Sequence, residues 1–421
     1  MADIKIDGKL FQERINHFIN AWKADKRAGD TVFSGVSSIL IMMGKVEENP
    51  EFQKNNAMHF WLLGYEFPTT LMLITTDTLY ILTTAKKAKH LEQLKGGRFP
   101  IEVLVRGKDV GCKREAIHQD CRYHQFRRIG LLTKDRSNGP FVDEWKKVFG
   151  DKCKDAEEVD ISGALSTAAF SVKDETELRS MRAASKACVA LMTPFFLDQM
   201  SDVLDQEKKV KHSALADKVD RKLDDEKWWK TVELPNKQRL PSDFDPASLD
   251  WYLGPAVQSG GKYDLKLQTE PTGDNLHPGV IIADARKYLQ VSLSVHNLVL
   301  KEIKDGVVAK DVYSKALSYI KSKKPELEKH FLKNVGAGIG IESKDPTLVL
   351  SGKNSRTLKD GMTLCITTGF TDVENPSPKD KLSKTYSLVL TDTIRVTNSD
   401  PVVFTGDAPT DLDATSFFLQ R

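Results

Sequence analysis

The acidic residue best placed for chemistry is Asp284, which directly follows the apolar residues 280–283 (VIIA). A short apolar run of this kind predicts a buried strand, and a carboxylate at the end of a strand can take part in catalysis. A capping or turn role is the more common reason for an acidic residue at such a position. The importance of Asp284 therefore depends on which other residues converge on it.

A glycine-rich run, residues 334–342 (NVGAGIGIE), is informative because of the side chains it lacks. Its glycines alternate with alanine and isoleucine, which predicts a tight passage of the backbone beside a sheet, where Cβ atoms would obstruct close approach. Between Asn334 and Glu342 there is no side chain that binds a metal or moves a proton. The run predicts close packing without chemistry.

The other metal ligands and nucleophiles are scattered along the chain. The five cysteines form no Cys-x-x-Cys pair, which indicates free thiols in a reducing compartment rather than disulfides or a zinc site. No Gly-x-Ser-x-Gly sequence marks a serine nucleophile. A structural role is favoured over a ligand role for each of the histidines His59, His118, His124, His212, His277 and His330.

The length and composition predict two globular lobes. A chain of 421 residues and 47.2 kDa exceeds the usual size of a single core, and its 40% hydrophobic and 29% charged residues are ordinary for a folded protein. No apolar run approaches the roughly 20 residues that span a bilayer. The amino terminus has no apolar signal region, so the cytosol or the nucleus is expected.

Alternating strand and helix patterns predict an α/β lobe at residues 1–172, in which residues 151–172 form a linker. Strands are expected at 34–43, 71–75, 78–83, 101–105 and 129–132, and helices at 10–22, 85–94, 113–128 and 141–149. The second lobe, 173–421, is expected to begin with a long helix that has a capping box at Asp174 and Glu177 and a kink at Pro194. Further helices are expected at 213–223, 289–303 and 311–321, and strands at 280–283, 361–370 and 385–396.

The charge is unevenly distributed although the net charge is only +3. Residues 86–136 contain fourteen lysines and arginines against six acidic residues. A solvated surface is the favoured interpretation. A weak contact with nucleic acid phosphates is the alternative, but no aromatic stacking pattern or base-reading motif supports it.

The order of these motifs resembles the pita-bread family of metallopeptidases, which includes methionine aminopeptidase, aminopeptidase P and creatinase. Within that family it is most similar to the catalytically silent amino-terminal domains of the large subunits of FACT histone chaperones. The resemblance implies a smaller amino-terminal α/β lobe, similar to that of creatinase, followed by an α+β pita-bread lobe. It is carried by residues 61–68 (WLLGYEFP), 141–147 (FVDEWKK), 258–266 (QSGGKYDLK), 299–306 (VLKEIKDG) and 334–342.

Active members of the family hold two divalent ions with two aspartates, one histidine and two glutamates, and the ions activate a water molecule. Asp284 matches the first aspartate. The position of the second aspartate falls on Val295, because about two dozen residues of a family hairpin are missing around Tyr288. The missing segment is either a natural deletion or a gap in the recorded sequence.

The remaining ligand positions hold neutral residues. Ala337 replaces the histidine of the family motif Gly-His-Gly-Ile-Gly, and Thr367 and Thr391 replace the two glutamates. A further family histidine, expected near residues 264–267, is also missing. The resemblance therefore implies a degenerate site at Asp284, Ala337, Thr367 and Thr391 with no catalytic residue, no bound metal and no cofactor.

The resemblance also implies a function. It points to a nuclear, chromatin-bound domain that binds core histones and nucleosomes and supports their reorganisation during transcription, replication and repair. An HMG-box-associated FACT subunit, bound through other domains, and replication or transcription factors are further implied partners, whereas direct DNA contact is weak or absent. Two alternatives stay open: a divergent metallopeptidase with a rearranged site, and a docking module for a non-histone chromatin factor. The histone-binding surface is unknown, and the groove around the degenerate site is a default candidate.

Overall fold

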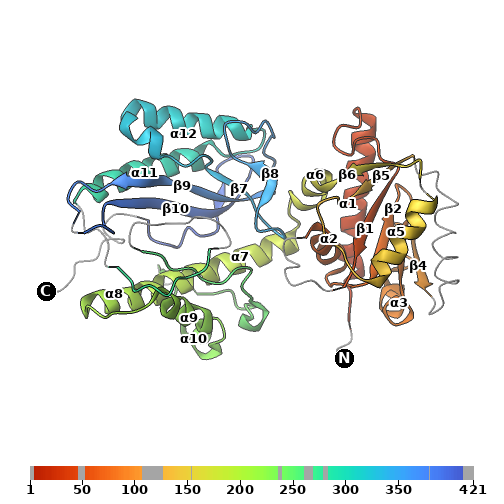
Figure 1. The fold of residues 1–421 in the computed structure, drawn as a ribbon, viewed down its shortest axis with the longest axis horizontal. Coiled ribbons are helices and arrows are strands. Elements are labelled where there is room, and N and C mark those ends of the chain that lie inside the picture. Colours follow the sequence, from red (N-terminus) through yellow and green to blue (C-terminus); the bar gives the residue numbers. More distant parts are fainter. Residues whose placement is uncertain are drawn as a thin grey trace. The chain divides into compact units, whose positions relative to one another are not determined.

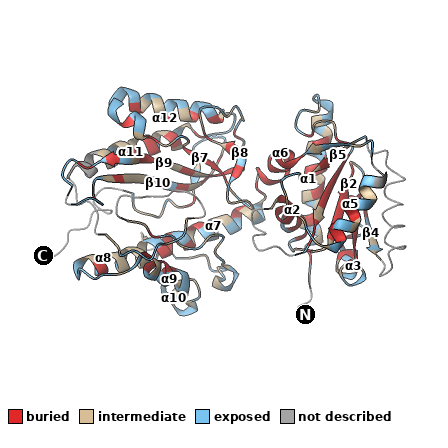
Figure 2. Cartoon of the chain, viewed as in Figure 1, coloured by how far each residue is buried: buried red, intermediate tan, exposed pale blue. Residues whose placement is uncertain are grey.

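The computed structural model describes residues 4–45, 53–106, 127–152, 154–235, 239–259, 269–277, 283–378 and 380–410. The chain divides into two compact units, Met1–Ser171 and Val172–Arg421, each with its own sheet and its own hydrophobic core (Figure 1). Figure 2 shows buried residues along the strands of both sheets. Residues 107–126 of the basic region lie outside the described residues.

Unit 1 contains a six-stranded mixed sheet with the strand order β4-β3-β2-β1-β5-β6. The expected hairpin is confirmed, since β2 and β3 pair antiparallel and place Leu71 opposite Leu82. β1 pairs antiparallel with β2 and parallel with β5, while β3 and β4 are parallel. The strands are β1 Ser38–Met43, β2 Thr70–Ile74, β3 Leu79–Thr84, β4 Ile101–Arg106, β5 Arg128–Leu131 and β6 Glu157–Asp160.

The helices of unit 1 follow the hydrophobic pattern of the sequence. Asp7 caps the first helix by accepting hydrogen bonds from the backbone N–H groups of Lys9 and Leu10, both at 3.0 Å. The expected apolar stripe of this helix is buried, and the expected helix at 113–128 lies almost wholly outside the described residues. The helices are α1 Gly8–Arg27, α2 Lys54–Leu63, α3 Ala85–Leu91, continued by the 3-10 turn η2 Glu92–Leu94, and α5 Pro140–Lys152.

The predicted linker at 151–172 is wrong. Strand β6 pairs parallel with β5 as an edge of the sheet, and α6 Ser162–Leu165 leads into the π-helical segment η3 Ser166–Phe170. Leu165 and Phe170 are buried, and the ring of Phe170 meets Trp61 edge-on with centroids 6.0 Å apart. The sequence did not predict these elements, because many of their buried residues are serines and alanines, which produce no strong hydrophobic period.

Unit 2 opens with a long helical stretch made of α7 Glu175–Ala190, the π-helical segment η4 Leu191–Leu197 and α8 Asp198–Asp205. The predicted capping box is confirmed, because Asp174 Oδ1 accepts from the Glu177 N–H at 2.8 Å and Glu177 Oε2 accepts from the Asp174 N–H at 3.1 Å. Pro194 lies within η4, where a wider turn accommodates a residue that cannot donate a backbone hydrogen bond. Two further helices are α9 His212–Lys222 and α10 Glu226–Thr231.

The stretch Glu175–Asp205 is also the one described helical segment that is long and apolar enough to cross a membrane by length and composition. Its apolar side chains are shared between two clusters of unit 2. Ala187 and Leu191 pack with Trp229 and Leu234, and Val203 packs with Leu215. We therefore assign the stretch to the packing of unit 2.

The sheet of unit 2 has the strand order β11-β10-β9-β7-β8, with antiparallel neighbours throughout. Helix α11 packs against β9 and β10, and α12 packs on α11 (Figure 1). The core between them contains Val295, Val299, Ile366 and Phe370. The elements are α11 Ala283–Glu302, α12 Ala309–Lys323, the 3-10 helix η7 Pro325–His330, β7 Gly336–Gly338, β8 Asp345–Val349, β9 Thr363–Glu374, β10 Thr385–Arg395 and β11 Val402–Val403.

The strand predicted at 280–283 is not found as expected. Residues 278–282 lie outside the described residues, and Ala283, the predicted last residue of the strand, begins α11. Asp284 therefore lies in the first turn of a helix rather than at a strand end. Good helix formers in the sequence Ala-Asp-Ala-Arg-Lys, with an acidic residue near the helix amino terminus, explain this start.

Candidate functional site

Strand register brings three of the four candidate positions onto one face of the unit 2 sheet. Ala337 of β7 lies opposite Cys365 of β9, and Thr367 of β9 lies opposite Thr391 of β10. Cys365 and Thr367 are two residues apart on the same strand, so their side chains point to the same face. Ala337, Cys365, Thr367 and Thr391 form this face, which we call the threonine face.

The threonine face consists of neutral groups. The Thr391 hydroxyl donates to Thr367 Oγ1 at 3.4 Å, and Cys365 Sγ lies 3.8 Å from the same oxygen. Burial raises the pKa of the Cys365 thiol, and the nearby charge of Asp392 also raises it, so the thiol stays protonated near neutral pH. Ala337 is buried and Thr391 is exposed. The side chains at these four positions supply a methyl, a thiol and two hydroxyls.

The position of the Asp284 side chain relative to the threonine face is not described. The backbone of Asp284 lies in the first turn of α11, and its side chain is outside the described part of the molecule. Val295, at the position where the resemblance places a second aspartate, is buried in the core on the same helix. Among the described residues, no group of three or more His, Cys, Asp or Glu side chains is arranged to hold a metal ion.

The glycine-rich run forms β7 and the turn that follows, and close approach of the backbone explains its first glycine. Gly336 has φ +141°, and a Cβ atom there would lie 2.4 Å from the carbonyl oxygen of Cys365. A side chain at this position would therefore collide with the backbone of β9. The expected tight passage is confirmed, although the run takes part in the sheet as a strand between β8 and β9.

The end of the run packs against a buried lysine that sequence reasoning missed. A Cβ atom on Gly340 would lie 2.3 Å from Cε of Lys173, the residue just before the cap of α7. Burial lowers the pKa of the Lys173 ammonium, while the carboxylates of Glu177, Asp345 and Glu342 favour its charged form. The lysine stem thus occupies the space that Gly340 leaves open.

A second feature that sequence reasoning missed lies on the opposite face of the sheet, under α11. His296 is 3% exposed; its Nδ1 lies 2.8 Å from the Thr368 hydroxyl and its Nε2 lies 2.9 Å from Asp392 Oδ2. The Thr405 hydroxyl donates to the other oxygen of Asp392. We call Thr368, His296, Asp392 and Thr405 the core polar network. The available signal was the position of His296 within the buried stripe of α11, one residue after Val295.

The other described histidines that the sequence singled out have local partners. His212 contacts the hydroxyls of Thr272 and Ser259 at 2.8 and 2.6 Å. His277 Nε2 lies 2.8 Å from Asp380 Oδ2, and this contact holds the pKa of the Asp380 carboxyl at about 2. His330 contacts a backbone carbonyl, whereas His59 is wholly buried and its pKa is lowered to about 3, chiefly by burial. His118 and His124 lie outside the described residues.

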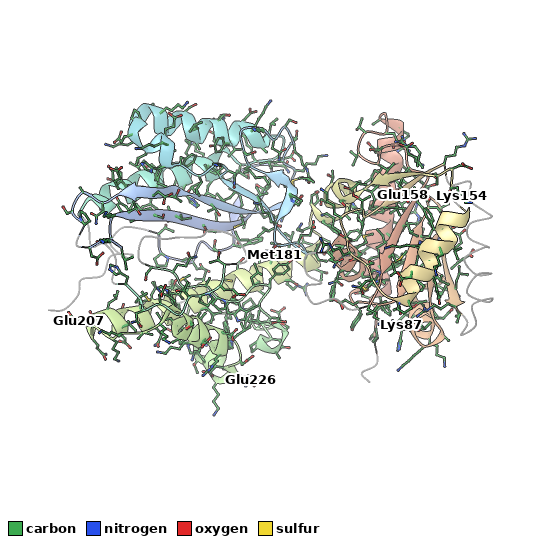
Figure 3. The ribbon with its side chains drawn as sticks, in the orientation of Figure 1. Lys87, Lys154, Glu158, Met181, Glu207 and Glu226 are labelled. Carbon is green, nitrogen blue, oxygen red and sulfur yellow. The ribbon has the colours of Figure 1, made fainter. Side chains whose placement is uncertain are left out.

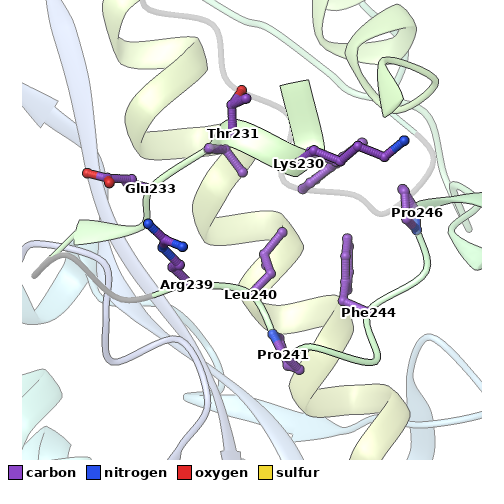
Figure 4. A pocket seen from close by; sticks show the side chains of 10 residues that line it. Lys230, Thr231, Glu233, Arg239, Leu240, Pro241, Phe244 and Pro246 are labelled. Carbon is purple, nitrogen blue, oxygen red and sulfur yellow. The ribbon is translucent and has the colours of Figure 1, made fainter. Parts of the chain in front are cut away.

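A cavity of about 500 Å³ lies elsewhere in unit 2, beside α10 (Figure 4). Its wall combines rings and apolar side chains with charged groups. None of the four candidate positions contributes to it. The lining residues are Trp229, Lys230, Thr231, Val232, Glu233, Arg239, Leu240, Pro241, Phe244 and Pro246.

Two family models match the chain, one in each unit. Residues 6–164 match the FACT complex subunit SPT16 N-terminal lobe domain, and residues 179–398 match metallopeptidase family M24. The first match covers the mixed sheet of unit 1. The second covers α11, α12 and the strands that carry the threonine face.

Similar full-length proteins are FACT subunits of fungi. The chain is 65% identical to FACT complex subunit ctc-2 of Neurospora crassa over 445 residues, and 35% identical to FACT complex subunit SPT16 of Yarrowia lipolytica over 442. It spans about 43% of the length of each. The Neurospora alignment has 445 positions against the 421 residues of this chain, so at least 24 positions are gaps in this chain.

Solved structures match over nearly the whole length of the chain. The N-terminal domain of FACT complex subunit SPT16 from Eremothecium gossypii matches with a TM-score of 0.84 and 27% identity, over 96% of this chain and 97% of that one. Dipeptidase PepE from Mycobacterium ulcerans matches with a TM-score of 0.61 and 12% identity, over 95% and 96% of the two chains, which shows a shared fold alone. The predicted fold class, an α/β lobe followed by a pita-bread lobe, and the resemblance noted in the sequence are both confirmed.

Proposed function

Since the chain belongs to metallopeptidase family M24, we propose that it is a non-catalytic member that binds proteins instead of cutting them. Its similarity to FACT subunits extends this proposal to a histone chaperone domain that binds core histones and nucleosomes. The single observation that carries the non-catalytic part is the neutral threonine face. Two residues, Thr367 and Thr391, stand opposite each other there with hydroxyls in hydrogen-bonding contact.

The former metal positions in this proposal are Asp284, Ala337, Thr367 and Thr391. Divalent ions held for hydrolysis need several carboxylate or imidazole ligands, and a methyl or a hydroxyl does not replace their charge. Converging carboxylates repel one another when no metal is present, so neutral residues relieve that repulsion. The missing hairpin near Tyr288 is proposed as the reason why no second aspartate is present, in keeping with the gaps against the Neurospora relative.

Location and further partners follow from the same similarity. We propose that residues 1–172 and 173–421 act as two domains of a nuclear, chromatin-bound protein, and that its other parts bind an HMG-box-associated subunit. Replication or transcription factors are additional candidates. Because the net charge of +3 is close to zero, shape and local acidic groups must contribute to histone contact beyond simple charge neutralisation.

The first prediction concerns catalysis. The purified chain, incubated with Mn²⁺, Co²⁺ or Zn²⁺ and a peptide library, is expected to release no amino acids above background, because the threonine face supplies no charged ligand. Mass spectrometry of the library measures this. The Asp284→Ala variant is the control for trace contaminating peptidases, since it must give the same background. Turnover that this substitution abolishes would support the alternative of a metallopeptidase with a rearranged site.

The second prediction concerns histones. The chain is expected to bind core histone heterodimers at micromolar concentration or tighter, measured by isothermal titration calorimetry. If the threonine face is the contact, Thr391→Arg should weaken binding about tenfold, because a basic side chain there repels a basic partner. Ser322→Arg, an equally exposed change on α12, is the matched control and should leave the affinity unchanged.

Two other outcomes of the same titration have clear meanings. Equal affinity in the Thr391→Arg and Ser322→Arg variants would remove the threonine face from the histone contact while leaving the histone proposal intact. If the chain binds no core histone heterodimer at micromolar concentration, the result would instead favour a docking module for a non-histone chromatin factor.

A further inference from the structure

Thr69 in unit 1 has an unusual backbone conformation. Its φ is +55°, in the left-handed region, although threonine is β-branched. Such a residue is a conformational outlier and costs on the order of a few kilocalories per mole, so surrounding contacts must hold it. The Thr69 N–H donates to the Gly44 carbonyl at 2.7 Å, which ties the residue to the end of β1. Outliers of this kind cluster at binding sites.

Two cationic side chains meet at the hydroxyl of Thr69. Lys87 Nζ lies 3.4 Å and Arg106 Nη2 lies 3.2 Å from Thr69 Oγ1. The two charged nitrogens are therefore separated by no more than the sum of these distances. Lys87 comes from α3 and is labelled in Figure 3, while Arg106 is the last residue of β4. Elements far apart in the sequence thus bring two positive charges to one polar atom.

Within the described part of unit 1, this pair has an excess of positive charge. Burial and the nearby Arg106 lower the pKa of Lys87, and burial lowers the pKa of Arg106, although Glu144 favours its charged form. The Arg106 guanidinium lies 4.6 Å from the centroid of the Phe141 ring, and its Nε is buried without a hydrogen-bond partner. Among the described residues, Glu144 thus offsets the charge of Arg106 in part, and the Arg106 Nε donor has no acceptor.

We propose that Lys87, Arg106 and Thr69 form a binding site for an oxyanion, namely the phosphate or carboxylate group of an acidic or phosphorylated peptide side chain. Arginine offers a planar fork of donors that matches such groups, lysine adds a point charge, and the hydroxyl supplies a further donor. Stacking on Phe141 holds Arg106 in place, and a hydrogen bond from Lys87 Nζ to the Pro68 carbonyl holds the lysine beside it. Histone tails are basic and would be repelled by this cationic site. The partner bound here would therefore be an acidic or phosphorylated peptide.

The test is titration of the whole chain with inorganic phosphate, and with three peptides that share one sequence and carry serine, phosphoserine or glutamate at the central position. Isothermal calorimetry or chemical-shift changes measure the affinity. Lys87→Gln and Arg106→Gln should each weaken phosphate binding about tenfold or more, since each removes a charge-assisted hydrogen bond. Lys89→Gln, an exposed change on the same helix, is the matched control and should have little effect.

The peptide arms identify the source of the oxyanion. Preference for the phosphoserine peptide assigns a phosphate, and equal binding of the glutamate peptide assigns a carboxylate. Circular dichroism of each variant separates loss of binding from loss of folding. The proposal is overturned if phosphate does not bind at millimolar concentration, or if Lys89→Gln weakens binding as much as Lys87→Gln does.

Discussion

Replacing His296 by alanine is expected to lower the free energy of unfolding of unit 2 by about 3 kcal/mol. The imidazole lies between Thr368 and Asp392, next to the hydrophobic cluster that contains Val295 and Ile366. Without it, the buried Asp392 keeps the Thr405 hydroxyl but loses its contact with His296. An incompletely paired carboxylate at low exposure is costly because water cannot replace the missing donor.

Urea unfolding followed by circular dichroism measures this loss. Asn297→Ala, an exposed change one residue along α11, is the matched control and should alter stability by less than about 0.5 kcal/mol. The double variant His296→Leu with Asp392→Leu should recover part of the loss, since it leaves no incompletely paired carboxylate in the core. Equal stability of the His296→Ala and Asn297→Ala variants would contradict a structural role for the core polar network.

Gly336→Ala is expected to destabilise unit 2 by about 3 kcal/mol or more, because two separate costs add. The added Cβ would meet the Cys365 carbonyl oxygen at 2.4 Å, and the residue has φ +141°. The obstructing atom belongs to the backbone of β9, which cannot move without disturbing the pairing with both β7 and β10. Relief of the contact would therefore disrupt the sheet that carries Ala337, Thr367 and Thr391.

The melting temperature by differential scanning calorimetry measures this second effect. Gly254→Ala provides the control, since a Cβ there meets no atom within 4 Å. A fall of several degrees for Gly336→Ala, with little change for Gly254→Ala, is expected. If both variants have the same melting temperature as the parent chain, the close contact between β7 and β9 does not require glycine at position 336.

Local patterns predicted most of the regular elements. The stripe at 10–22 became α1, and the two β-rich runs on either side of the Thr76-Asp77 turn became the β2–β3 hairpin. The capping box at Asp174 and Glu177 placed the start of α7 correctly. These predictions succeeded because capping, turn formation and amphipathic burial depend on residues close together in the chain.

Two predictions failed for a shared reason. The supposed linker holds an edge strand and a π-helical segment, and Ala283 begins a helix where a strand was expected to end. In both places local composition was ambiguous, and the outcome depended on partners elsewhere: β5 for the edge strand, and the sheet strands β9 and β10 for α11. Tertiary packing overrides weak local preference in such segments.

By itself, the sequence determined the family pattern, the neutral character of Ala337, Thr367 and Thr391, and the need for glycine at position 336. Each of these depends only on which residue type stands at a given place in the order of motifs. Only the tertiary structure placed the three neutral residues on one face, put His296 with Asp392 on the other, and brought Lys87 and Arg106 to the Thr69 hydroxyl. The physical reason is that strand register and helix docking set which distant side chains meet, and no local pattern encodes a contact between residues so far apart in the chain.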